Sequence, residues 1–263
     1  MSNAVPKLGS FCWIELATTD QAAAKHFYGS LFGWTANDVP IGPPGQFYTM
    51  FQLAGRQVAA GYTLRPDQLT RGVPPHWGLY ILVESADATA ERIAKAGGNV
   101  LMPPFDALDV GRMAVIKDPA GAAFSIWQAK KSGEFVTAEP GALCWADLNS
   151  PDPVRATRFY TDVFGWNYTV DTHSDPPSGY LHIQNGSDFI GGVPPLRPES
   201  ARIPPHWLSY FQVADCDSTA ARAREMGAKF CLEPFTMENV GRFAILDDPQ
   251  GAAFAIFQPM PRK

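Results

Sequence analysis

Two carboxylates and two imidazoles recur at matching places in this sequence. Glu15 belongs to the segment Phe-Cys-Trp-Ile-Glu-Leu, and Asp147 belongs to the similar segment Leu-Cys-Trp-Ala-Asp-Leu. His76 and His206 each follow two prolines and precede a tryptophan. A histidine beside a carboxylate can serve as a general base, and both side chains can bind a divalent metal. The residue types therefore indicate two equivalent polar sites, one in each half of the chain.

The elements that position these residues belong to a tandem duplication. Collinear matches link the two halves at a spacing of 132 residues, which becomes 130 residues farther along the chain. The matched segments are Phe11–Leu16 with Leu143–Leu148, Phe27-Tyr28 with Phe159-Tyr160, Phe32-Gly33-Trp34 with Phe164-Gly165-Trp166, Pro74–Trp77 with Pro204–Trp207, and Val110–Arg112 with Val240–Arg242. We expect two homologous domains, at 8–130 and 140–260, because repeats of this kind mark duplicated structural units.

Each half begins with a strand and a capped helix. Alternating apolar residues at 11–17 predict the strand, and apolar residues at helical spacing predict a helix over 21–32. Asp20 is the expected N-cap and Gly33 the expected left-handed C-terminal residue. Strands follow, and the same strand-helix-strand order restarts at Trp77. The pattern therefore predicts an α+β protein with four βαβββ modules.

This organisation resembles the vicinal oxygen chelate superfamily, which includes glyoxalase I, bleomycin-resistance proteins and extradiol dioxygenases. The resemblance is carried by the first strand and Asp-capped helix, with Phe-Tyr and Phe-Gly-Trp, and by the Asp-Pro-x-Gly turn before the last strand of each half, at Asp118 and Asp248. It implies that the four modules pair into two glyoxalase-like domains. Their curved mixed sheets would form cups that hold a ligand.

The resemblance also implies a divalent metal, but the positions of the family's ligands argue against one. The first-strand position falls on Trp13 and Trp145, and the last-strand position falls on Ser125 and Ala255. Tryptophan and alanine cannot bind a metal, and a lone serine binds one poorly. We therefore expect no metal and no cofactor.

A register shifted by two residues keeps side chains on the same strand face. It would direct Glu15 with His76, and Asp147 with His206, into the cups, while Trp127 and Phe257 would take the third position. Three interpretations stay open. The pairs hold a divalent metal weakly, or they form a dyad that contacts a small ligand, or they are structural. In the structural case the carboxylates bond to backbone amides or to Arg112 and Arg242, and the histidines cap the strand entry.

Aromatic residues on the same strand faces favour a binding site for a flat or apolar molecule. Packing within the core is the alternative for these side chains. The candidate ligand-binding residues are Trp13, Tyr80, Arg112, Trp127, Trp145, Tyr210, Arg242 and Phe257. The leading functional expectation is a metal-independent small-molecule-binding protein of the glyoxalase or bleomycin-resistance type. A glyoxalase-like lyase or isomerase, or a dioxygenase-related enzyme, is the alternative, and catalysis by Glu15, His76, Asp147 and His206 is left open.

Composition excludes several other classes. The net charge of −5 and the scattered Lys and Arg residues argue against a nucleic-acid surface. No apolar run is long enough to cross a bilayer, and the first residues do not form a signal peptide. The four cysteines form no Cys-x-x-Cys pair, and Cys12 and Cys144 occupy equivalent places in the repeat, which fits buried apolar residues better than a disulfide. We expect a cytoplasmic protein that is either a monomer with internal pseudo-symmetry or a homodimer.

Overall fold

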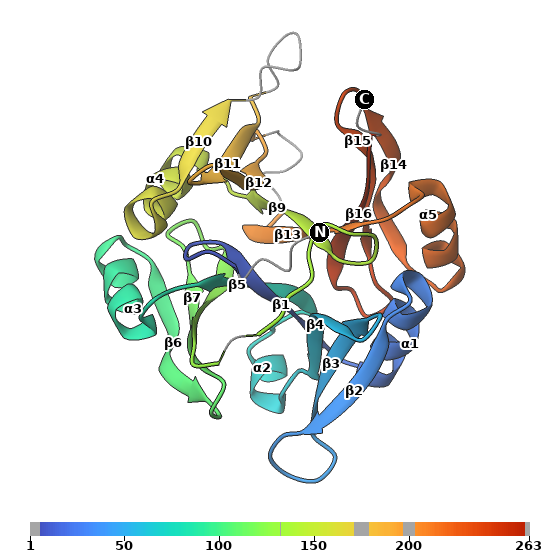
Figure 1. Ribbon diagram of the computed structural model, residues 1–263, viewed down its shortest axis with the longest axis horizontal. Coiled ribbons are helices and arrows are strands. Elements are labelled where there is room, and N and C mark those ends of the chain that lie inside the picture. Colours follow the sequence, from blue (N-terminus) through green and yellow to red (C-terminus); the bar gives the residue numbers. More distant parts are fainter. Residues whose placement is uncertain (1–5, 132, 171–178, 197–202, 261–263) are drawn as a thin grey trace. The chain divides into compact units, whose positions relative to one another are not determined.

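The computed structural model describes residues 6–131, 133–170, 179–196 and 203–260. Figure 1 labels the elements, and the two halves repeat one order of strands and helices. The first half contains β1 (Phe11–Thr18), α1 (Gln21–Phe32), β2 (Thr35–Pro40), β3 (Phe47–Leu53), β4 (Arg56–Thr63), α2 (Pro66–Thr70), β5 (His76–Leu82), α3 (Ala86–Lys95), β6 (Asn99–Ala107), β7 (Gly111–Lys117) and β8 (Ala123–Ala129). The second half contains β9 (Leu143–Asn149), α4 (Pro153–Phe164), β10 (Asn167–Val170), β11 (Leu181–Asn185), β12 (Asp188–Val193), β13 (His206–Gln212), α5 (Cys216–Glu225), β14 (Lys229–Met237), β15 (Gly241–Asp247) and β16 (Ala253–Pro259).

Each half supplies one mixed sheet of eight strands. The strand orders are β2-β3-β4-β1-β5-β8-β7-β6 and β10-β11-β12-β9-β13-β16-β15-β14, which are equivalent. In the first sheet β1 pairs parallel with β4, and β5 pairs parallel with β8, whereas the hairpins are antiparallel. The predicted α+β class and the four βαβββ modules are confirmed.

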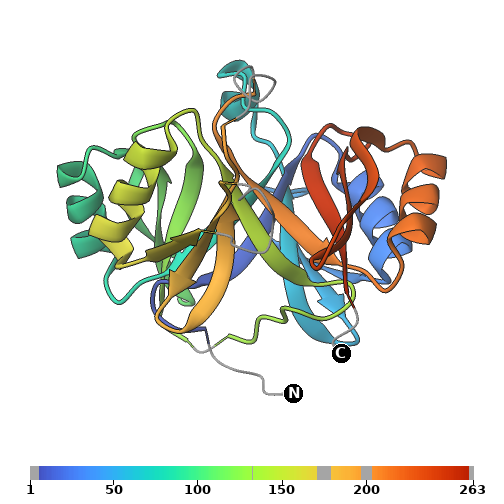
Figure 2. The ribbon, with the colours of Figure 1, turned by 90° about the horizontal axis from the view of Figure 1, so that it is seen from above.

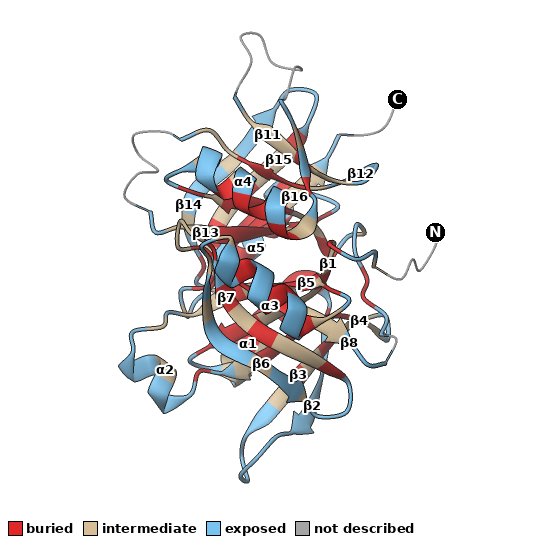
Figure 3. Cartoon of the chain, turned by 90° about the vertical axis from the view of Figure 1, so that its left-hand side faces the viewer, coloured by how far each residue is buried: buried red, intermediate tan, exposed pale blue. Residues whose placement is uncertain are grey.

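The capping predictions for the first helix of each half are also confirmed. The side chain of Asp20 accepts a hydrogen bond from the backbone N–H of Ala23, and Gly33 ends α1 with φ of +74°. Asp152 and Gly165 act in the same way on α4. One stripe of α1 is buried, and the opposite stripe faces solvent, as the helical spacing predicts. Figure 3 shows the same division between a buried and an exposed face on α3.

The Asp-Pro-x-Gly segment forms the expected turn, and its carboxylate organises it. One oxygen of Asp118, Oδ1, accepts hydrogen bonds from the backbone N–H groups of Ala120, Gly121 and Ala122 at 2.7–2.9 Å. Gly121 has φ of +110°, a conformation that glycine adopts far more readily than other residues. Asp248 makes equivalent bonds in the second half.

The chain packs as two compact units, and each unit takes segments from both halves. The first unit contains Met1–Trp13, Gly78–Gly133 and Trp145–Leu208, and the second contains Ile14–Trp77, Glu134–Cys144 and Ser209–Lys263. In Figure 2, α3 lies beside α4 in the first unit, and α1 lies beside α5 in the second. The boundaries 8–130 and 140–260 therefore describe the repeat and its sheets, and they stay a prediction about domains.

A buried tyrosine–aspartate pair joins the two homologous halves within each unit. The hydroxyl of Tyr160 on α4 lies 3.2 Å from Asp118, and the hydroxyl of Tyr28 on α1 lies 3.0 Å from Asp248. Each hydroxyl also accepts the indole N–H of the tryptophan in the Pro-Pro-His-Trp segment, from Trp207 or Trp77, at 3.0 Å. The motifs that identify the fold therefore contact one another in the core.

Two elements differ from the sequence-based expectation. The short helix α2 was not predicted, and Pro66 at its first turn fits a helix start. The strand β6 extends through Pro103 and Pro104, with register shifts against β7 on either side of Met102. Proline lacks the N–H that a ladder needs, which explains why the pairing is irregular there.

The described residues include no disulfide and no membrane-spanning helix. The four cysteines are free thiols. Within the described ranges, no helix is both long enough and apolar enough to span a membrane.

Candidate functional site

The clearest arrangement of polar and aromatic side chains lies on one face of β9 and its neighbours in the first unit. Trp145, Asp147 and Asn149 alternate along β9 and so share a face. Asp147 is in register with Gly192 on β12, which is in register with His182 on β11. Adjacent strands lie about 4.8 Å apart, so these positions form a row across the sheet.

Tyr180 fills the space that Gly192 leaves in this row. A Cβ added to Gly192 would lie 1.8 Å from the Tyr180 hydroxyl oxygen, so the phenol lies directly over the glycine. The hydroxyl donates to Oδ1 of Asp147 at 2.5 Å, and it accepts the indole N–H of Trp145 at 2.8 Å. That N–H also lies 3.1 Å from the same Asp147 oxygen. Asp147 is 5% exposed, so this hydrogen-bonded group is largely shielded from water.

His182 completes a group that we call the Trp145 cluster: Trp145, Asp147, Tyr180, His182 and Phe189. The imidazole meets three aromatic rings edge to face, at centroid distances of 6.0 Å for Trp145, 5.2 Å for Tyr180 and 5.4 Å for Phe189. Edge-to-face packing is a favoured arrangement for such rings. The cluster therefore holds aromatic surface and one hydrogen-bonded carboxylate in a defined geometry.

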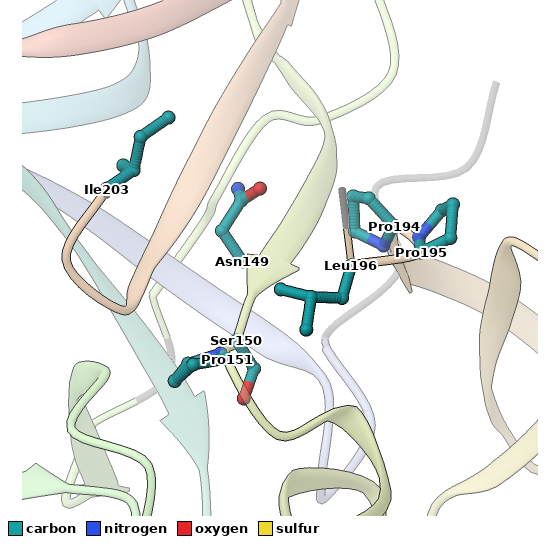
Figure 4. Close-up of a pocket in the computed structure, with 7 residues that line it drawn as sticks. All are labelled: Asn149, Ser150, Pro151, Pro194, Pro195, Leu196 and Ile203. Atoms are coloured by element: carbon teal, nitrogen blue, oxygen red, sulfur yellow. The ribbon is translucent and has the colours of Figure 1, made fainter. Parts of the chain in front are cut away.

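A small pocket lies at the end of the same strand. Its space is about 320 Å³, including the part open to solvent, and it is lined by Asn149, Ser150, Pro151, Pro194, Pro195, Leu196 and Ile203. Figure 4 shows the Asn149 side chain pointing between Ile203 and the Pro194–Leu196 segment. Asn149 therefore lines the pocket and lies on the face of β9 that carries Trp145 and Asp147.

His206 contacts Asn149, which lines this pocket. Its Nδ1 lies 2.8 Å from the carbonyl of Pro204, and its Nε2 lies 3.5 Å from the Asn149 amide nitrogen. If Nδ1 carries the proton, Nε2 is the acceptor for the amide. In place of the expected pair of Asp147 and His206, Asn149 contacts the imidazole and Tyr180 bonds to the carboxylate.

The first half places Glu15 and His76 in the second unit. Glu15 is in register with Ala60, which pairs with Met50, so this row has alanine where the second half has Gly192. Burial, followed by the charge of Glu15, raises the pKa of Tyr62. His76 lies 2.8 Å from the carbonyl of Pro74, and burial lowers its pKa, so its ring is neutral at pH 7.

The remaining predicted aromatic residues fall into two groups. In the first unit, Tyr80 and Trp127 meet edge to face with centroids 6.3 Å apart, and the Trp127 ring covers Gly111. In the second unit, Tyr210 lies 6.3 Å from Phe243, which is paired in register with Phe257. Trp13 is half-buried on β1.

Arg112 and Arg242 pair with aspartates on helices, and not with Glu15 and Asp147, which was one possibility within the structural interpretation. The guanidinium of Arg112 makes two bonds to Asp87 on α3, at 2.7 and 2.8 Å, and Arg242 makes two bonds to Asp217 on α5, at 2.8 and 2.6 Å. These pairs satisfy the guanidinium groups on the helix side of the sheets. The predicted role of both arginines in ligand binding stays a prediction.

Sequence reasoning missed Tyr180, although a signal for it was present. Tyr48 and Tyr180 are 132 residues apart, the spacing that relates the other first-module matches. His182 has Met50 at its counterpart position, so a comparison of the two halves gives no signal for it, and the structure places this histidine in the Trp145 cluster.

The residues present do not fit the metal that the resemblance implies. Among the described residues, no three His, Cys, Asp or Glu side chains gather where they could hold a metal ion. In the row through Asp147, the neighbouring positions hold Gly192 and His182. Tyr180 and Trp145 both donate hydrogen bonds to one oxygen of the Asp147 carboxylate. We derive no chemical step through a metal, and metal independence stays a prediction.

A family model identifies the protein class. The Glyoxalase/Bleomycin resistance protein/Dioxygenase superfamily model matches residues 10–126 and 142–256. The chain therefore belongs to this superfamily.

Two named relatives cover nearly the whole chain. "Putative glyoxylase CFP32" of Mycobacterium bovis is 41% identical over 256 residues, which is 95% of each protein. Anthracycline biosynthesis protein DnrV of Streptomyces peucetius is 36% identical over 261 residues, covering 95% of this chain and 93% of the relative.

Solved structures confirm the fold at low sequence identity. The Mn(II)-bound glyoxalase from Novosphingobium aromaticivorans has a TM-score of 0.65 and 16% identity, covering 96% of this chain and 82% of that one. The 2,3-dioxygenase LapB from Pseudomonas sp. KL28 has a TM-score of 0.64 and 13% identity, covering 98% and 96%.

Proposed function

We propose that this protein binds a planar aromatic small molecule on the Trp145 cluster without using a metal. The observation that carries the proposal is the half-buried Trp145 ring, held by hydrogen bonds of its N–H to Tyr180 and Asp147. An indole fixed in this way offers a preformed stacking surface, because little side-chain entropy remains to be lost on binding.

The chemistry of the cluster favours an aromatic ligand over a charged one. Tyr180, His182 and Phe189 add ring surface around Trp145, and Phe189 is 54% exposed. The carboxylate of Asp147 is turned toward its two donors within the sheet. A relative named for anthracycline biosynthesis supports the same class, since anthracyclines are fused-ring aromatic compounds.

Tryptophan fluorescence titration with 2-hydroxyanthraquinone tests the proposal. We expect saturable quenching in the wild type and about tenfold weaker binding in Trp145→Ala, which corresponds to about 1.4 kcal/mol from a lost aromatic contact. Phe47→Ala removes an exposed aromatic ring from another strand and should leave affinity unchanged.

Metal content is measured on the same samples. Binding should survive exhaustive treatment with a chelator. The proposal fails if no hydroxyanthraquinone quenches the protein. It also fails in its metal-free form if the purified protein holds stoichiometric metal that is lost in His76→Ala and His206→Ala.

A further inference from the structure

His182 on β11 is a polar side chain that has an apolar counterpart, Met50, in the first half. The row His182–Gly192–Asp147 corresponds to Met50–Ala60–Glu15, so a thioether stands where the second half has an imidazole. Both positions lie on the same face as the carboxylate of their row. A ligand bound on this face of the second half would therefore meet an imidazole, and one bound on the equivalent face of the first half would meet a thioether.

The geometry holds the imidazole and leaves its nitrogens available. Edge contacts to Trp145, Tyr180 and Phe189 fix the plane of the ring. No described residue forms a hydrogen bond with either ring nitrogen, and the side chain is half-buried. A neutral imidazole has one donor and one acceptor nitrogen, so it can bond to a hydroxyl or a carbonyl.

The other polar groups of the cluster have partners. The Trp145 N–H reaches Asp147 and Tyr180, and the Tyr180 hydroxyl donates to Asp147. Gly192 has no side chain, and Phe189 is apolar. A hydrogen bond that distinguishes one flat ligand from another would therefore come from His182.

We infer that His182 is the specificity-determining residue of this site and that it selects planar aromatic molecules bearing a ring hydroxyl. The inference rests on the proposed function, because the aromatic surface supplies binding and the imidazole supplies discrimination. A site that hydrogen-bonds a substrate hydroxyl rejects an analogue that lacks it, because the buried partner is then left unpaired.

Two ligands of matched size test this inference. The hydroxyl of 2-hydroxyanthraquinone is replaced by a methyl group in 2-methylanthraquinone, which lacks the ring hydroxyl, whereas the two quinone carbonyls are common to both compounds. By calorimetric titration, we expect the wild type to prefer the hydroxyl compound by about tenfold, equivalent to ~1.4 kcal/mol for one hydrogen bond. His182→Met, which copies the first half, should abolish this preference and leave affinity for the methyl compound within about twofold.

Controls separate the imidazole from general effects on the fold. Met50→His should leave the preference unchanged, and His182→Gln should retain part of it, because an amide can also bond to a hydroxyl. Circular dichroism checks that each variant is folded. If His182→Met is not folded, the ligand preference is measured in His182→Gln instead.

The outcomes separate the inference from the proposed function. Equal wild-type affinity for both compounds overturns the inference and leaves the proposed function standing. Persistence of the preference in His182→Met also overturns the inference. Failure of the wild type to bind either compound overturns both.

Discussion

At the scale of single residues, the absence of a side chain at Gly192 organises the site. Asp147 lies among the aromatic rings of the Trp145 cluster, and a buried carboxylate is costly unless hydrogen-bond donors satisfy it. Tyr180 can reach it only by crossing the position next to it, where any Cβ would overlap the phenol. One glycine therefore makes possible both the bond to Asp147 and the position of the aromatic ring.

We predict that Gly192→Ala displaces Tyr180 and destabilises the protein by about 1–3 kcal/mol, as overpacking does. Affinity for 2-hydroxyanthraquinone should fall with it. The reason is steric, so the same substitution should cost little in a Tyr180→Ala background. Urea unfolding of the two single variants and the double variant measures this coupling. Additive effects would contradict the geometry described.

The residue scale is also where sequence reasoning is weakest. The identities of Glu15, Asp147, His76 and His206 were visible, but their partners were not. Alternation fixes the face of a side chain, whereas its partner depends on cross-strand register and on side-chain direction. Arg112 and Arg242 bond to Asp87 and Asp217, which lie in helices. The strand pattern of the sequence does not indicate these partners.

At the scale of elements, the Phe-Tyr helix and the Asp-Pro-x-Gly turn are joined by a buried hydrogen bond. The turn aspartate takes backbone N–H groups on one oxygen and a tyrosine hydroxyl from the other half on the second oxygen. Burial raises the pKa of Tyr28 and Tyr160 well above the usual value, and the nearby aspartates raise it further. Each phenol therefore stays protonated and donates its hydrogen bond.

We predict that Tyr28→Phe lowers the free energy of unfolding by about 2–4 kcal/mol, because two buried groups lose a partner. These are the Asp248 carboxylate and the Trp77 N–H. Tyr160→Phe should have a similar effect through Asp118 and Trp207. Urea unfolding is the measurement.

Tyr168→Phe is the matched control for this prediction. The Tyr168 hydroxyl is buried and has no hydrogen-bond partner among the described residues, so its removal should be neutral or stabilising. If all three variants lose equal stability, the hydrogen bonds of the tyrosine–aspartate pairs are not the cause.

At the scale of the whole molecule, the residue pattern predicted the four modules, whereas their pairing was implied by the family resemblance alone. It could do so because turn residues, caps and apolar periodicity are local properties that appear in every copy. It could not predict the compact units, because homology between halves does not say which buried surfaces meet. The contacts of Tyr28 with Asp248, and of Trp166 with the Gly9 carbonyl, join residues far apart in the chain.

This packing leads to a prediction about the connection between the halves. Each compact unit contains segments from both halves, with buried pairs such as Tyr160–Asp118 and Trp34–Gly141. Cutting the chain at a protease site inserted at Gly133 should therefore leave the fragments associated. They should co-elute from a size-exclusion column in buffer and separate only in denaturant. If each half were an independent domain, the fragments would separate in buffer and each would keep its own cooperative unfolding transition.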